Sequence, residues 1–154
     1  TQSRSSAASD VYKRQRDGAP RALPPGIYAL SNHLLDTPWP KLARTKAAFT
    51  AVLEHAPQPD MPALFAALAD RQGAEDDELP ATGLPRDREK LLSSPFIVSP
   101  NYGTRSSSVL ALHAGGAGQL EERRFAPDGS VSGESRLAFA WQGGFSGDML
   151  AECG

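Results

Sequence analysis

Apolar residues recur at helical spacing through the middle of the chain, and this pattern predicts helices there. A first helix should begin near Pro40, because proline is tolerated in a first turn, and end at about His55. Asp60 can cap a second helix, and a third and weaker helical stretch covers 86–92. The apolar faces of the first two helices comprise Leu42, Phe49, Val52, Leu53 and Ala56, and then Met61, Leu64, Phe65 and Leu68.

Beyond Ser94 the period changes to that of β-strands. Strands are expected at 96–99, 104–113, 120–125 and 136–141, with turns at 115–118 and 127–129. Leu137, Phe139 and Trp141 share one face of the last strand, so we expect one face of this meander to be covered. An earlier apolar run, Gly26–Ser31, predicts a further, buried strand. The order of elements predicts an α+β fold, an antiparallel sheet with two or three helices packed on it.

The two ends of the chain lack an apolar period. Residues 1–18 are polar and are expected to be a disordered or non-native leader. Residues 142–154 have no clear pattern and are expected to form a loose tail. One domain should therefore cover residues 19–141.

The composition of the chain argues against several classes of function. The 154 residues carry 16 basic and 18 acidic side chains, so there is no excess of basic residues to indicate nucleic-acid binding. No apolar run approaches the roughly 18 residues that a membrane span needs. The single cysteine, Cys153, excludes an internal disulfide and favours a reducing, cytoplasmic compartment. The three histidines lie at no metal-ligand spacing, so no metal site is expected. The oligomeric state stays open.

Two segments carry an unusual signature: GIYALSNHLLDTPWPK at Gly26–Lys41, and YGTRSSSVL at Tyr102–Leu110, which is followed by EERRF. Together they resemble the carboxy-terminal half of the NRDE family, of the transport-and-Golgi-organisation type, over about residues 19–141. That family has an Asn-Arg-Asp-Glu string near its amino terminus, usually preceded by a cysteine after the initiator methionine. Neither occurs here, so the resemblance predicts a truncated chain without activity of its own.

The family resembles the amino-terminal-nucleophile hydrolases, which implies that this chain is part of an α-β-β-α sandwich. By that likeness the full-length parent is an amidase or acyl-transfer enzyme whose amino-terminal cysteine attacks a small-molecule amide. The likeness gives Asn32, after the first predicted strand, a supporting role in stabilising an oxyanion. The residues alone equally allow Asn32 to be a turn residue that bonds its own loop.

Arg105 opens a predicted strand, and its guanidinium could hold a carboxylate, phosphate or oxyanion beside Asn32. Alternatively it pairs with a loop carboxylate such as Asp36. The remaining predicted ligand contacts are Asp36, Trp39, Lys41, Tyr102 and Thr104. The structural alternatives are that Asp36 bonds backbone amides near the helix start, that Trp39 anchors the loop, and that Tyr102 and Thr104 shape a turn.

The resemblance also implies a non-catalytic role, because eukaryotic members of the family are linked with Golgi organisation, acyl-CoA balance and haem mobilisation. In that case Lys41 and Arg105 would hold a propionate or phosphate, while Trp39 and Tyr102 supply apolar contact. Haem would then be a transported ligand and not a resident cofactor, held through its carboxylates. A third possibility is that the chain is a structural half of a larger protein and has no activity of its own.

Overall fold

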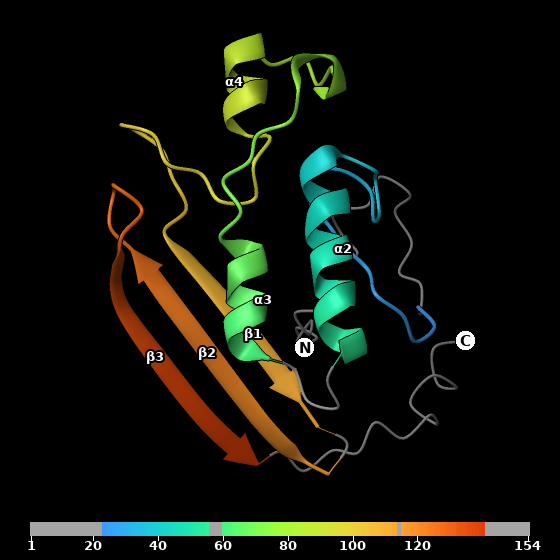
Figure 1. Cartoon of the computed structure of the whole chain (residues 1–154), viewed down its shortest axis with the longest axis vertical. Helices are drawn as coiled ribbons and strands as arrows, with labels where there is room; N and C mark the ends of the chain where they lie inside the picture. Colours follow the sequence, from blue (N-terminus) through green and yellow to red (C-terminus); the bar gives the residue numbers. More distant parts are fainter. Residues whose placement is uncertain (1–22, 56–59, 114, 141–154) are drawn as a thin grey trace, which may run out of the picture.

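The computed structural model describes residues 23–55, 60–113 and 115–140. In these residues three antiparallel strands form one sheet, and helices pack against it (Figure 1), which confirms the α+β prediction. The expectations for residues 1–18, 142–154, Trp141 and Cys153 lie outside the described residues. In chain order the elements are α2 (Pro40–His55), α3 (Met61–Leu68), the 3-10 helix η1 (Asp76–Glu78), α4 (Arg86–Leu91), β1 (Ser106–Leu112), β2 (Ala117–Phe125) and β3 (Val131–Ala140).

Helix α2 has the predicted bounds, and Leu42 is buried on its inner face. Phe49 and Val52 are partly buried against the core, whereas Leu53 is 43 % exposed and does not belong to the apolar face predicted for it. No helix in the described ranges combines the length and apolar character that crossing a membrane requires.

Helix α3 begins where the sequence predicts. The side chain of Asp60 accepts a hydrogen bond from the amide of Ala63 at 3.4 Å and so satisfies one of the free donors of the first turn. Leu64 and Phe65 are buried and form the core with Val109 of β1. Helix α3 therefore packs directly on the sheet, and α2 packs beside α3.

The sheet has the order β1-β2-β3, as a meander does. Its register places Leu110, Leu120 and Leu137 directly opposite one another in a row across the three strands. The predicted turn after β2 is present: Gly129 adopts φ 79°, a left-handed conformation that glycine reaches without steric cost. Strand pairing is irregular at Arg124/Phe125, where a bulge precedes this turn.

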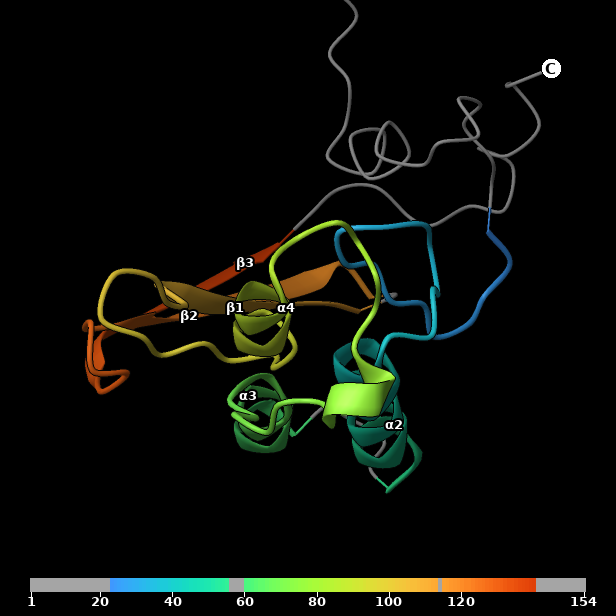
Figure 2. The same cartoon turned by 90° about the horizontal axis from the view of Figure 1, so that it is seen from above.

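Figure 2 shows α2 and α3 on the same side of the sheet. The covered face of the sheet carries Val109, which is 7 % exposed, whereas Leu137 on the opposite face is 57 % exposed. One face of the meander is covered, as predicted, but within the described residues it is the face of Val109 and not that of Leu137 and Phe139. Periodicity assigns residues to a common face, but α3 packs on the other face.

Two predicted strands do not form in the described residues. Gly26–Ser31 has no regular structure, because the amide and carbonyl of Ala29 are bonded to Asp36 and not to a neighbouring strand. The predicted strand at 96–99 is reduced to one bridge between Val98 and Gly103. An apolar run becomes a strand only where a second backbone satisfies its donors and acceptors.

Candidate functional site

The loop before α2 is closed by Asp36. The Ala29 amide donates to Asp36 Oδ1 at 2.9 Å, and the Asp36 amide donates to the Ala29 carbonyl at 2.8 Å. Lys46 of α2 donates to the same carboxylate at 2.9 Å, and this ion pair fastens the loop to the helix. The hydrogen bond from Lys46, and then the one from Ala29, hold the pKa of Asp36 below its usual value, against an opposing effect of burial.

Asp36 itself adopts φ 55°, a left-handed conformation that aspartate tolerates better than most residues. The closed turn directs the chain so that Trp39 and Lys41 follow at the start of α2. Thr37 donates to the Leu34 carbonyl and bonds the His33 ring nitrogen Nδ1 at 3.0 Å. The His33 ring lies 5.7 Å from the Trp39 ring, so the loop presents an aromatic pair beside the helix start.

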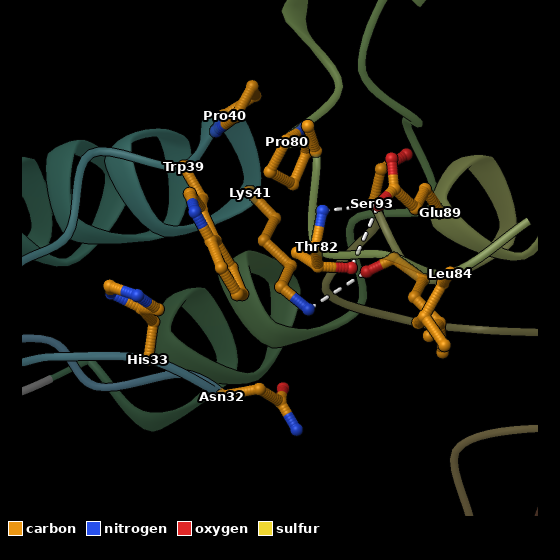
Figure 3. Close-up of a pocket in the computed structure, with 12 residues that line it drawn as sticks. Asn32, His33, Trp39, Pro40, Lys41, Pro80, Thr82, Leu84, Glu89 and Ser93 are labelled. Atoms are coloured by element: carbon orange, nitrogen blue, oxygen red, sulfur yellow. Dashed lines mark hydrogen bonds between the residues drawn. The ribbon is translucent and has the colours of Figure 1, made fainter. Parts of the chain in front are cut away.

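A cavity of about 530 Å³ lies between this loop and the segment around α4 (Figure 3). Asn32, His33, Trp39 and Lys41 line one side of it. The other side consists of Pro80, Ala81, Thr82, Leu84, Glu89, Leu92 and Ser93. Signature residues thus share a cavity with residues some 40 to 60 positions later in the chain, by their numbering.

Lys41 is the cation of this cavity. Its Nζ donates to the carbonyl of Leu92 at 2.8 Å, just after α4, and lies 5.8 Å from the centre of the Trp39 ring. Among the described residues no carboxylate forms an ion pair with Lys41. Burial lowers the pKa of the Lys41 amine, because the charged form loses water without gaining a counter-charge.

Glu89 holds the opposite wall in place. Its Oε1 accepts hydrogen bonds from the Thr82 amide at 2.6 Å and from the Thr82 hydroxyl at 2.8 Å. These bonds lower the pKa of Glu89 and keep its buried carboxylate charged. Because both bonds end on Thr82, Glu89 fixes the 80–84 segment against α4.

Asn32 is an exposed residue at the cavity rim. Its Oδ1 accepts a hydrogen bond from the Ser31 hydroxyl at 3.2 Å. Within the described residues, no acceptor takes a hydrogen bond from its side-chain NH2 group.

The family model for Transport and Golgi organisation 2 (TANGO2) matches residues 2–127. The chain belongs to this family. It is 33 % identical over 129 residues to the human "Transport and Golgi organization protein 2 homolog", which covers 77 % of this chain and 47 % of that protein. The cattle homologue of the same name is 32 % identical over 119 residues, 73 % of this chain and 43 % of that protein. The chain thus spans less than half the length of these TANGO2 relatives.

The second signature segment, Tyr102–Leu110, does not line this cavity. Thr104 bonds Ile97 through both its amide and its hydroxyl, and the carbonyl of Tyr102 accepts from Ser99. The carbonyl of Arg105 accepts from Phe125, while its side chain is exposed. In Figures 1 and 2 this segment and the loop before α2 lie on opposite sides of α3 and α4.

The structure therefore brings Asn32, Trp39 and Lys41 into one cavity. Asp36, Tyr102, Thr104 and Arg105 do not line it. The ion pair of Asp36 is with Lys46, which contradicts its predicted pairing with Arg105. That Arg105 acts together with Asn32 stays a prediction.

Sequence reasoning missed the wall formed by Thr82, Leu84 and Glu89. A lone glutamate on a short charged helix carries no signal of burial, because such helices are ordinarily solvated. The turn before α4, with Pro80 and Pro85 around Gly83, was the only local indication that the segment has a defined path. In the described parts of the chain, no group of three or more His, Cys, Asp and Glu side chains is placed to hold a metal ion.

Proposed function

We propose that the cavity binds the anionic head of an amphipathic ligand, a carboxylate or phosphate attached to an apolar body. An acyl-CoA or the propionate of haem has this chemistry. The observation that carries the proposal is the Lys41 ammonium, partly buried without a carboxylate partner among the described residues. A buried cation without a counter-charge is costly, and an anion that fills the cavity offsets that cost.

The lining of the cavity supports an amphipathic ligand over a simple anion. Trp39, Leu84 and Leu92 offer apolar surface, and the NH2 group of Asn32 at the rim can donate a further hydrogen bond to the ligand head. A volume of about 530 Å³ is ordinary for a small-molecule site. The names of the relatives connect them with transport and Golgi organisation. A carrier of acyl-CoA or haem in trafficking is the role we propose for this chain.

Titration with a non-reactive ligand tests this proposal. S-hexyl coenzyme A, a thioether, and haem are added to the full chain, to Lys41→Met and to Lys90→Met. Lys90 is the matched control, because its ion pair with Asp76 lies outside the cavity. Removing a charge-assisted hydrogen bond of about 1.5–3 kcal/mol should weaken binding about 10- to 100-fold in Lys41→Met alone.

Affinity should also depend on pH. The pKa of Lys41 lies below 10.5, so its charge, and binding with it, is lost as the pH rises through that lowered value. Equal affinities of the two variants, or no saturable binding by the wild-type chain, contradict the proposal.

A second candidate function is acyl transfer in a full-length relative. The NH2 group of Asn32 at the rim, which has no acceptor among the described residues, favours it, because such a donor can stabilise an oxyanion once a nucleophile is supplied from outside this chain. In a full-length relative that carries an asparagine at this position, replacing it with alanine should lower kcat for amide hydrolysis by about 10²–10³. Mass spectrometry of the mature relative supplies an independent test, since a retained initiator methionine rules out an amino-terminal cysteine nucleophile.

A further inference from the structure

The three lysines in the described residues have different surroundings. Lys46 pairs with Asp36 at 2.9 Å, and Lys90 pairs with Asp76 at 2.6 Å. The hydrogen bond from Asp76 raises the pKa of Lys90. Lys41 instead meets a neutral carbonyl, that of Leu92. Two of these amines thus form ion pairs with carboxylates, and the third forms none with the described residues.

The bond to Leu92 leaves the Lys41 amine competent to react. A neutral amine still has an N–H to donate to the Leu92 carbonyl at 2.8 Å, and its lone pair remains directed elsewhere. Burial lowers the pKa of Lys41, so a larger share of its amine is neutral at a given pH than for an exposed lysine. Desolvated lysines are used as nucleophiles for this reason.

The cavity around the Lys41 amine has space for an acyl group. Figure 3 shows the Lys41 side chain extending between the Trp39 ring and the Thr82–Leu84 wall. Apolar side chains on both sides suit an acyl chain, and the amine lies at the end of Lys41 within the same cavity.

We propose that Lys41 is an acylation site that accepts the acyl group of a thioester bound in this cavity. The inference rests on the proposed binding of such ligands in this cavity, but in the opposite orientation: the thioester carbonyl, and not the anionic head, lies at the neutral form of Lys41. Lys41 Nζ attacks the thioester carbonyl, an N–C bond forms and the C–S bond breaks. The thiol leaves as a thiolate, which takes up the proton released by the amine, so the products are an N-acyl-lysine and a free thiol.

Acylation would switch off the binding site that it uses. The amide product has no positive charge, and the acyl group occupies the cavity. Reversible binding of the anionic head should therefore disappear in the acylated protein. The site would respond to the supply of acyl thioester, being open at low supply and blocked at high supply.

Site-resolved labelling tests the proposal. The full chain is incubated with hexanoyl coenzyme A near pH 7.5, and acylation of Lys41, Lys46 and Lys90 is followed by peptide mass spectrometry. Lys41 should be acylated severalfold faster than Lys46 and Lys90, because burial leaves a larger share of its amine neutral and the thioester is bound beside it. Its rate should level off below pH 10.5 as the amine becomes fully neutral. Equal rates at the three lysines overturn the proposal.

A conservative variant separates binding from transfer. Lys41→Arg keeps the cation but removes the nucleophile, so it should bind S-hexyl coenzyme A and lose the fast labelling. Wild-type protein that binds the thioether yet leaves Lys41 unlabelled overturns the acylation site alone. Failure to bind the thioether at all overturns the proposed function. If Lys41→Arg does not fold, as judged by circular dichroism, the relative rates in the wild-type chain still decide.

Discussion

The two faces of the sheet differ in how well they are covered: helix α3 packs on the more charged face, whereas the more apolar face is exposed in the described residues. The face under α3 carries Val109 but also the ion pairs of Glu121 with Arg136 and of Arg123 with Glu134. The opposite face carries the leucine row of Leu110, Leu120 and Leu137, which are 56, 37 and 57 % exposed.

The more charged face is covered because its long side chains are compatible with packing. The Arg123 guanidinium lies 4.2 Å from the Phe65 ring of α3, so its planar group extends the apolar core while its charge pairs with Glu134. The covered face of the sheet is therefore the one on which a helix can pack, and not the one that is more apolar. Within the described residues nothing covers the leucine row, which makes it an exposed apolar patch.

Matched leucine truncations should give the largest difference between the two faces. Leu64→Ala removes a side chain that is 4 % exposed and should lower the free energy of unfolding by about 2–5 kcal/mol. Leu137→Ala should lower it by less than about 1 kcal/mol, because much of that side chain already contacts water. Urea unfolding measures both. Similar losses for the two variants would mean that the leucine row is covered in solution.

Neighbouring residues of β1 allow the same test within one strand. Val109→Ala should cost about 1–3 kcal/mol, and Leu110→Ala less than about 1 kcal/mol, although leucine loses more atoms. Thermal unfolding of both variants at one pH gives the ranking. The reverse ranking would show that the covered and open faces have been assigned the wrong way round.

The ion pairs should differ by a smaller amount. Glu121 is 8 % exposed and accepts from Arg136 at 2.6 Å, whereas Arg124 and Glu122 pair at 3.0 Å on the open face. Double-mutant cycles should give a coupling energy of about 1 kcal/mol or more for the first pair and below about 0.5 kcal/mol for the second. The comparison fails if the open-face pair couples more strongly.

A charge introduced into the leucine row should change stability least. Leu120→Lys is expected to alter the free energy of unfolding by no more than about 1 kcal/mol, since its neighbours on this face contact solvent. It should reduce the fluorescence of an apolar-surface dye such as anilinonaphthalene sulfonate. Unchanged dye binding would place the exposed apolar surface somewhere else.

Local chemistry in the sequence was sufficient for the helices and the meander. Pro40 and Asp60 specify helix starts through fixed φ and side-chain capping, which need no distant partner. The alternation in 136–141 assigns Leu137 and Phe139 to one face for the same reason, because side chains on a strand point alternately to its two sides. Signature residues also identified Trp39 and Lys41 as candidates, and both line the cavity.

Only the tertiary structure decided which face is covered, whether an apolar run finds a strand partner, and what completes the cavity. Gly26–Ser31 has strand composition, yet the backbone of Ala29 is bonded to Asp36. Glu89 is an ordinary residue of a charged helix in the sequence, and only the fold brings Thr82 to it. These outcomes depend on contacts between residues far apart in the chain, and the free energy of such contacts is not encoded in any local pattern.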